Sequence, residues 1–260
     1  MQKTKLVAPL IFKYCVNAIK NNVLIKRVSR RDKEFHFQDW FKRILEQIKQ
    51  AEGINYEQLG RNSYPDFVLV KYLEGYEVKG LAYPGRELNF DANSQIPKGY
   101  YNERTIFYVF GRYPKNPDGD EYPVLDLVIC HGNFLNADNS YEHENKHVKG
   151  FGSYGDILIR DRKMYVVPTP FGLLEGVAHH RTLILPEGED PGEDFFQVGK
   201  IERIEAKELL VAYTFDLKKN EIYPKRVPNP NAGKSHIFYA WRLKGEPKNR
   251  VNLRDKRVLE

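Results

Sequence analysis

The sequence predicts a mixed α/β fold of the α+β kind, and three observations support this prediction. Two segments near the N-terminus, 6–20 and 35–51, place apolar residues at helical spacing. Beyond residue 63 the chain consists mainly of short segments that alternate or run apolar, as strands do. With 260 residues, the chain is also long enough to bury a full hydrophobic core. We therefore expect helices first and a β-rich region after them.

The two predicted helices differ in how they are recognised. The first spans 6–20, and Pro9 lies early enough in it to occupy a first helical turn. A charged, polar connection follows at 28–34. The second helix spans 35–51, and its predicted buried stripe comprises Phe37, Phe41, Ile44, Leu45 and Ile48.

The strands are predicted from apolar patterning and are separated by turn signals. One pair is expected within 63–80, and further strands are expected at 104–113, 124–131, 156–168, 196–204 and 209–217. Turns are expected at 117–119, 136–139 and in the acidic loop 186–194. The tail from Lys244 onward is polar and basic, and we expect loose order there. The length fits one elaborated domain or two small ones. We favour one domain over 1–260, with a helical part (1–50), a core (51–135) and a β-rich part (136–260).

Charge and cysteine usage limit the possible settings of the protein. The net charge of +6 and the pI near 9.0 suit a polyanionic partner without identifying one. Cys15 and Cys130 form no spaced framework, which favours a reduced intracellular protein. We find no signal peptide and no apolar run that could cross a bilayer, so we expect a soluble, cytoplasmic protein without a membrane partner.

The most informative stretch is 63–80, which contains Pro65-Asp66 and then Glu77-Val78-Lys79. On a strand, Glu77 and Lys79 leave the same face, while Val78 points into the core and keeps its carbonyl available as a ligand. Mg²⁺ prefers carboxylate, carbonyl and water oxygens. Asp66 would supply the second carboxylate, and Lys79 could orient a water for attack on a phosphodiester.

This interpretation depends on the pairing of the two strands. With a two-residue turn at Glu74-Gly75, paired residue numbers would add up to 149, and the Asp66 and Glu77 carboxylates would lie roughly 20 Å apart. Asp66 faces Glu77 only if the numbers add up to 143, which requires a loop at 70–73 or a bulge near Gly75. The alternative is an ordinary amphipathic hairpin that carries surface Asp, Glu and Lys.

The spacing of Asp66, Glu77 and Lys79 resembles the signature of PD-(D/E)xK nucleases. The following Asn93-Ser94-Gln95-Ile96-Pro97 is similar to segments of some type II restriction endonucleases, so the resemblance covers roughly 35–99. It implies a mixed central sheet flanked by helices, with additional β-rich elements. It also implies Mg²⁺ bound by Asp66, Glu77 and the Val78 carbonyl, with Lys79 as the third catalytic group. The preceding helix could add an acidic ligand from Asp39 or Glu46, although we favour solvated surface charges for both.

The resemblance implies a type II restriction endonuclease. Such an enzyme hydrolyses double-stranded DNA at a short sequence and leaves 5′-phosphate and 3′-hydroxyl ends. We expect a homodimer, with a monomer as the alternative, and a cognate DNA methyltransferase in the same host. One alternative is a structure-selective repair or junction nuclease of the same fold. Another is a non-catalytic DNA-binding protein, in which Asp66 and Glu77 would be solvated and apart.

Candidate DNA contacts are polar and basic groups, because they can neutralise phosphates or bind base edges. They are Asn93, Ser94, Gln95, Lys98, Arg160, Arg162, Arg181, Lys225, Arg226, Lys234 and Arg242. Each basic cluster could also be a solvated face.

A second motif points to different chemistry. His143, Glu144 and His147 satisfy the His-Glu-x-x-His pattern of zinc metalloproteases, which requires a helix. The flanking residues are polar and Gly-rich and lack an apolar stripe, so we favour a polar loop over a protease site.

Overall fold

The computed structural model describes residues 6–27, 33–60, 63–92, 95–137, 148–160, 164–175, 180–216, 218–219, 221–248 and 252–253. The helices are α1 (Ala8–Lys20), α2 (Lys33–Glu52) and α3 (Pro170–Leu173), with a 3-10 turn at Gly132–Phe134. The strands are β1 (Ile25–Lys26), β2 (Tyr56–Gln58), β3 (Phe67–Leu69), β4 (Glu74–Tyr83), β5 (Asn89–Asp91), β6 (Tyr100–Tyr101), β7 (Arg104–Pro114), β8 (Glu121–Tyr122), β9 (Asp126–His131), β10 (Val148–Phe151), β11 (Ile157–Arg160), β12 (Met164–Pro168), β13 (Leu174–Glu175), β14 (Thr182–Pro186), β15 (Phe195–Ile204), β16 (Glu208–Asp216), β17 (Glu221–Pro228), β18 (Ser235–Leu243) and β19 (Asn252–Leu253).

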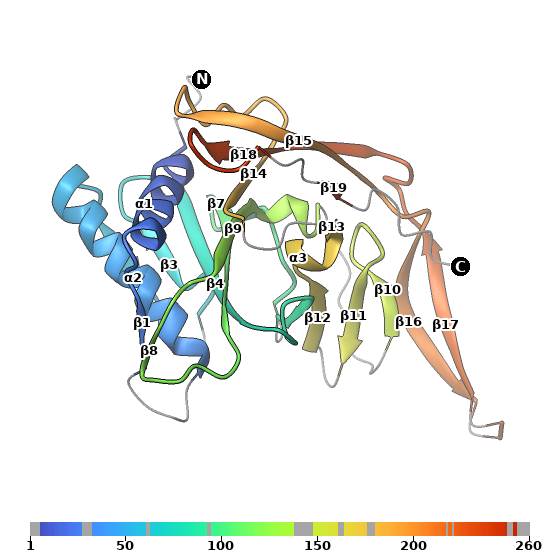
Figure 1. Cartoon of the computed structure of the whole chain (residues 1–260). Helices are drawn as coiled ribbons and strands as arrows, with labels where there is room; N and C mark the ends of the chain where they lie inside the picture. Colours follow the sequence, from blue (N-terminus) through green and yellow to red (C-terminus); the bar gives the residue numbers. More distant parts are fainter. Residues whose placement is uncertain are drawn as a thin grey trace.

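A mixed nine-stranded sheet forms the centre of the molecule (Figure 1). Its strand order is β15-β18-β14-β9-β7-β4-β3-β2, and β6 pairs with β7 beside this path. The β4–β7 and β9–β14 pairs are parallel, whereas the other pairs along the path are antiparallel. The predicted α+β class with a large mixed sheet is therefore confirmed at this level.

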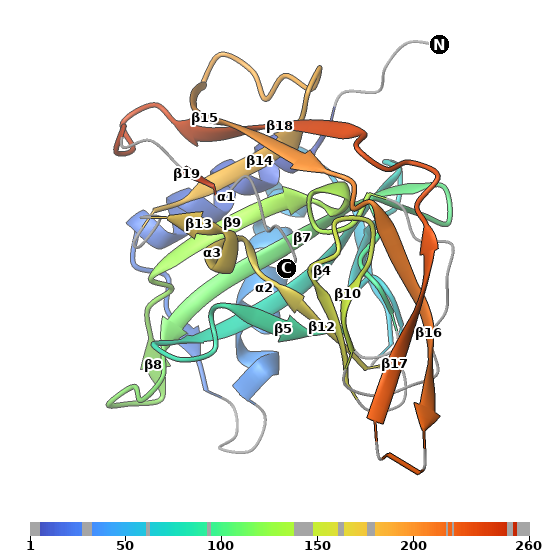
Figure 2. The same cartoon turned by 90° about the vertical axis from the view of Figure 1, so that its right-hand side faces the viewer.

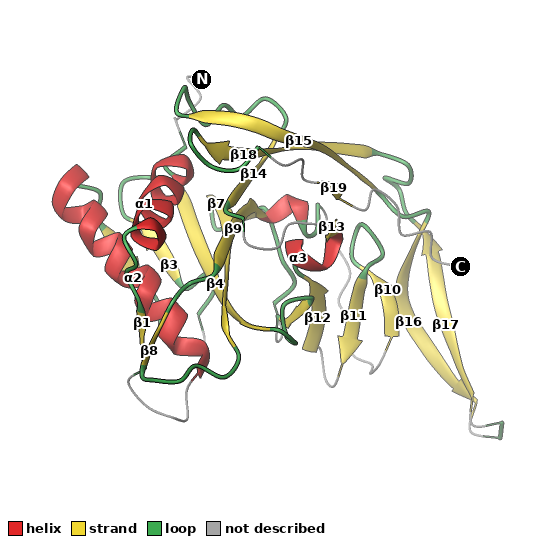
Figure 3. Ribbon diagram, viewed as in Figure 1, coloured by secondary structure: helices red, strands yellow, loops and turns green. Residues whose placement is uncertain are grey.

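Helices α1 and α2 lie together on one face of this sheet (Figure 3). They bury their apolar stripes, including the five residues expected for the second helix, against side chains that alternate strand residues send to that face. The buried Glu74 side chain links α1 to the start of β4, because it accepts a 2.6 Å hydrogen bond from the backbone N–H of Val7 at the helix N-terminus.

Two glycines allow α2 to approach the sheet closely. Gly80 of β4 and Gly111 of β7 are paired in register, and the ring of Phe37 fills the space above them. A Cβ atom at position 111 would lie 2.1 Å from the Phe37 ring, and one at position 80 would lie 2.8 Å from Phe37 Cβ. This contact fixes the position of the N-terminal half of α2 over β4.

The opposite face of the large sheet carries a second apolar cluster. A four-stranded sheet, ordered β10-β11-β12-β5, packs there and contributes Phe90, Tyr165 and Val167 (Figure 2). Strands β16 and β17 pair only with each other and form a long ribbon that projects from the body of the molecule in both views.

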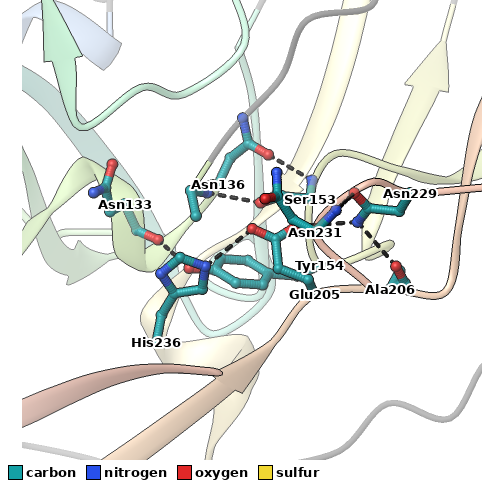
Figure 4. A network of polar contacts seen from close by, with 10 residues as sticks. Asn133, Asn136, Ser153, Tyr154, Glu205, Ala206, Asn229, Asn231 and His236 are labelled. Carbon is teal, nitrogen blue, oxygen red and sulfur yellow. Dashed lines mark hydrogen bonds and ion pairs between the residues drawn. The ribbon is translucent and has the colours of Figure 1, made fainter. Parts of the chain in front are cut away.

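A buried polar network holds the base of this ribbon (Figure 4). Glu205 binds His236 Nε2 at 3.0 Å and Asn229 Nδ2 at 3.2 Å through its two carboxylate oxygens. Asn136 accepts the Ser153 N–H at 2.7 Å, and the Tyr154 hydroxyl donates to the Asn133 carbonyl. Since buried polar groups require partners, this network ties β15 and β18 to the segments that lead into β10 and β16.

The structure differs from the sequence-based expectations in several places. The segment 156–168 contains two strands rather than one, and β14, β17 and β18 were not predicted. The turn expected at 136–139 lies partly outside the described residues, and the Asn136 side chain is buried and donates to the Pro97 carbonyl at 3.1 Å. The tail beyond Lys244 also contains a buried group, because Glu246 pairs with Lys20 and Arg181.

Candidate active site

The register of β3 against β4 brings the two motif segments together. Phe67 pairs with Tyr76 and Val68 with Gly75, so the paired residue numbers add up to 143, and the connection is the loop 70–73. The register required for Asp66 to face Glu77 is therefore confirmed. Gly75 contributes through its small size, because a Cβ atom there would lie 2.6 Å from Pro65 Cγ. Pro65 can thus lie directly against β4 just before Asp66.

A direct hydrogen bond joins Asp66 to the second motif segment. Asp66 Oδ2 accepts the backbone N–H of Val78 at 2.7 Å. In a strand the N–H and C=O of one residue point toward the same edge, so the Val78 carbonyl also faces the Asp66 side of β4. The Val78 side chain packs in the helix-covered core, as expected. Asp66 therefore contacts the strand segment that carries Glu77 and the Val78 carbonyl.

Glu77 and Lys79 leave the face of β4 opposite the helices. Lys79 Nζ lies 2.6 Å from Glu77 Oε1, and the two side chains are only 22% and 12% exposed. Lys79 Nζ also lies 5.7 Å from the centre of the Phe90 ring. Glu77 Oε2 is buried, and no hydrogen-bond partner is found for it among the described residues. A solvated surface hairpin would not have this arrangement.

The surroundings of Asp66 disfavour its charge. Burial, followed by the neighbouring Glu77 charge, raises the pKa of Asp66 from 3.8 to about 7. Three neighbouring groups lower the pKa of Asp66 without overcoming the effect of burial: Lys79, the Val78 N–H and the Gln38 side chain. Two desolvated carboxylates next to each other form a site that a cation would stabilise.

Helix α2 contributes an amide rather than an acid to this site. Gln38 donates a side-chain hydrogen bond to the Asp66 carboxylate. Asp39 is exposed, and Glu46 accepts a 2.6 Å hydrogen bond from the Tyr56 hydroxyl near the edge strand β2. The structure gives neither acidic residue a contact with Asp66 or Glu77. Gln38 directly precedes Asp39, but the sequence-based prediction considered only acidic residues of this helix and therefore did not include Gln38.

Aromatic residues that the sequence analysis also missed line the same face. Tyr64 contacts the rings of Tyr101 and Tyr108, at centroid distances of 5.1 and 6.5 Å, and its hydroxyl lies 3.0 Å from the Tyr108 hydroxyl. Tyr64 directly precedes Pro65-Asp66, which is the signal that could have identified it.

The candidate DNA contacts lie in very different surroundings. Lys225, Arg226 and Lys234 are exposed, the first two on the projecting β17. Lys98 is half-buried, with Nζ 5.8 Å from the Tyr101 ring centre, and the Gln95 N–H donates to the Ala92 carbonyl at 3.0 Å. Arg160 ends β11. Asn93, Ser94 and Arg162 lie outside the described residues.

Two of the arginines proposed to contact DNA are instead engaged inside the protein. Arg242 is fully buried, where it donates to Thr182 Oγ1 at 3.3 Å and to the Pro247 carbonyl at 2.6 Å. Arg181 is paired with the buried Glu246 at 2.7 Å. These contacts give both side chains a role in packing the β-rich part of the chain, and we do not carry them forward as DNA contacts.

No group of three or more His, Cys, Asp or Glu side chains that could hold a metal occurs in the part of the chain that the structure describes. The zinc-protease pattern of His143, Glu144 and His147 lies outside that part. The site at Asp66 differs from such a cluster, because it combines two carboxylates with a backbone carbonyl.

Within the described segments, no helix has the length and apolar character needed to span a bilayer. Comparisons with protein-family models, with curated proteins and with solved structures each found no match to this chain.

Proposed function

We propose that this protein is a Mg²⁺-dependent endodeoxyribonuclease with a PD-(D/E)xK fold. The observation that carries the proposal is the 2.7 Å hydrogen bond from the Val78 N–H to Asp66, formed in the register that places Asp66 opposite Glu77. The motif residues Asp66, Glu77 and Lys79 thereby form one half-buried group instead of three separate surface charges.

The residues present fit a divalent cation. Glu77 Oε2 is a buried carboxylate oxygen without a described hydrogen-bond partner, and burial next to Glu77 raises the pKa of Asp66. Asp66, Glu77 and the Val78 carbonyl would hold the ion, and they are all oxygen donors, as Mg²⁺ prefers. When bound, Mg²⁺ would acidify a coordinated water and stabilise negative charge on the attacked phosphate.

The remaining groups have roles that follow from their contacts. The Lys79 ammonium, held next to Glu77, can orient the attacking water and favour its deprotonated form. Gln38 and the Val78 N–H fix the orientation of the Asp66 carboxylate. Phe90 and Tyr108 restrict water on this face, which strengthens each electrostatic interaction there. In-line attack on the phosphodiester would leave 5′-phosphate and 3′-hydroxyl ends.

Duplex DNA is the proposed substrate, and the chain carries a net charge of +6. The exposed Lys225, Arg226 and Lys234 are the best-placed candidates for phosphate contacts in the β-rich part. Within the nuclease class we favour a type II restriction endonuclease that acts as a homodimer alongside a methyltransferase. The resemblance of 93–97 to segments of such enzymes supports this choice over a structure-selective nuclease.

The first experiment incubates the protein with plasmid DNA and Mg²⁺. We expect discrete fragments from the wild type, whereas a structure-selective nuclease would cut only branched DNA. Asp66→Ala and Lys79→Ala should each lower the cleavage rate more than about a hundredfold and retain DNA binding measured in Ca²⁺. Matched controls are Glu57→Ala and Lys71→Ala, which remove exposed charges next to β3 and should cut normally.

A second measurement does not depend on cleavage. Mg²⁺ should raise the thermal unfolding midpoint of the wild type, because a ligand that binds only the folded state stabilises it. Asp66→Ala should abolish this shift. Wild-type cleavage that persists in either active-site variant, or in EDTA, would refute the proposed mechanism.

A further inference from the structure

Tyr64 lies at the candidate active site but has no role in the chemistry described above. It immediately precedes Pro65-Asp66, and its ring packs between Tyr101 and Tyr108. The charge of Glu77 raises the pKa of the Tyr64 hydroxyl together with burial, which places this hydroxyl in the field of the same carboxylate that Lys79 contacts. The side chain retains partial exposure, whereas Tyr108 is fully buried.

The hydrogen bond between the Tyr64 and Tyr108 hydroxyls leaves the Tyr64 proton available. The Tyr64 oxygen lies 3.0 Å from the Tyr108 oxygen. A fully buried phenol requires an acceptor, and the only one the described residues offer Tyr108 is Tyr64. Tyr108 is therefore the donor in this pair. The Tyr64 oxygen accepts this hydrogen bond, and the Tyr64 proton remains for another partner.

No described side chain takes this proton. Glu77 Oε1 pairs with Lys79, and Glu77 Oε2 has no hydrogen-bond partner in the described residues, so neither is bonded to Tyr64. A hydroxyl donor oriented by an incoming hydrogen bond, next to a carboxylate site, is suited to an anionic oxygen that arrives with the substrate.

We propose that Tyr64 is a substrate-binding residue that donates its hydroxyl proton to a non-bridging oxygen of the phosphodiester positioned at Asp66 and Glu77. This inference rests on the proposed nuclease function and adds a neutral donor to the group that contacts the phosphate. Because Tyr108 holds the Tyr64 oxygen, the donor is oriented before substrate binds, and little reorganisation is needed as charge develops on the phosphate.

The test combines Tyr64→Phe with a sulfur substitution in the substrate. The wild-type cut position is mapped first, and duplexes are then prepared with a single phosphorothioate at that position in each of its two stereochemical forms. Sulfur is a weak hydrogen-bond acceptor, so one form should slow the wild type by about tenfold or more. Tyr64→Phe should lower kcat/KM on ordinary DNA by about 10- to 100-fold, and its penalty for that same form should disappear.

Tyr108→Phe is the matched control. It removes the same tyrosine–tyrosine hydrogen bond, and with it the fixed orientation of the Tyr64 donor, but leaves the Tyr64 proton in place. Its kcat/KM should therefore fall, while a penalty for that same phosphorothioate form remains. Thermal unfolding of both variants shows whether a lower rate results from lower stability or from loss of the hydrogen bond that Tyr64 donates to the substrate. If the wild type cuts and Tyr64→Phe keeps the full penalty for both forms, this inference alone is wrong. If the wild type does not cut DNA with Mg²⁺, the proposed function is wrong and this inference falls with it.

Discussion

Replacement of Asp66 by Asn should make the metal-free protein more stable at pH 8 while abolishing cleavage. Asp66 is buried next to Glu77, and this environment raises its pKa from 3.8 to about 7. The folded protein therefore binds a proton at Asp66 more tightly than the unfolded chain does. Asn has nearly the same shape, can still accept the Val78 N–H, and carries no charge to desolvate.

The magnitude follows from the pKa difference between the two states. A rise of about 3 pH units, at 1.36 kcal/mol per unit, sets an upper bound of about 4 kcal/mol on the cost of ionised Asp66. The amide does not reproduce every contact of the carboxylate, so we expect a net gain of about 2 kcal/mol. Between pH 4 and pH 7 the unfolded chain has lost the proton that the folded chain keeps. The cost therefore grows with pH across this window and is complete above about pH 7.

The assay is urea-induced unfolding in EDTA at pH 5 and pH 8. The free energy of unfolding of Asp66→Asn should exceed that of the wild type clearly at pH 8 and only slightly at pH 5. Asp118→Asn, at an exposed loop position, is the control and should change stability by less than about 0.5 kcal/mol at both pH values. A gain that is absent at pH 8, or equal at both pH values, would show that Asp66 is not a desolvated carboxylate in the folded protein.

Two further predictions test the elements that position Asp66. Gln38→Leu removes a hydrogen bond that favours ionised Asp66. Cleavage should therefore fall about tenfold, and the acidic limb of the pH–rate profile should move to higher pH. The control is Gln50→Leu at an exposed position near the end of α2, which should leave the profile unchanged. Gly111→Ala places a Cβ atom 2.1 Å from the Phe37 ring and should lower the free energy of unfolding by about 2 kcal/mol, whereas Gly119→Ala, with no atom within 4 Å, should be neutral when both are measured by urea unfolding.

The register of the motif strands could be limited but not decided from the sequence. Facing Asp66 and Glu77 required paired numbers that add up to 143, and either a loop at 70–73 or a bulge near Gly75 would give that sum. The structure contains the loop. The contact that decides the register is Pro65 against Gly75. Because these residues belong to different segments of the chain, their contact produces no periodic pattern in the sequence.

Gln38 shows why the helix contribution was harder to predict. A search for metal ligands selects acids, and the rotation of α2 determines which of Gln38 and Asp39 reaches the site. Phe37, seated over Gly80 and Gly111, sets that rotation. Helical periodicity identified Phe37 as buried, but the paired glycines beneath it are brought together only by the parallel pairing of β4 with β7.

The β-rich part was predicted less well because charged residues obscured its strands. Lys234 and Arg242 were interpreted as DNA contacts, yet 235–243 forms β18 between β14 and β15. Arg242 lies in the interior because Thr182 and the Pro247 carbonyl accept its hydrogen bonds. These hydrogen bonds offset the cost of burying the arginine charge. Sequence patterns do not reveal them when the acceptor is distant in the chain, as Thr182 is.

The desolvated carboxylates of the site destabilise the fold, and this cost in stability is the strongest reason to assign the site a function. A hairpin under no functional constraint could place Asp66 and Glu77 in water, where neither carboxylate would be desolvated. Instead, β4 directs Glu77 to a face lined by Phe90 and Tyr108, and Asp66 is held beside it by a backbone N–H and by Gln38. Lys79 lies 2.6 Å from Glu77 and also lowers the pKa of Asp66, but it carries one positive charge next to two carboxylates. A bound cation would supply the missing charge, since both carboxylates could then be ionised without mutual repulsion.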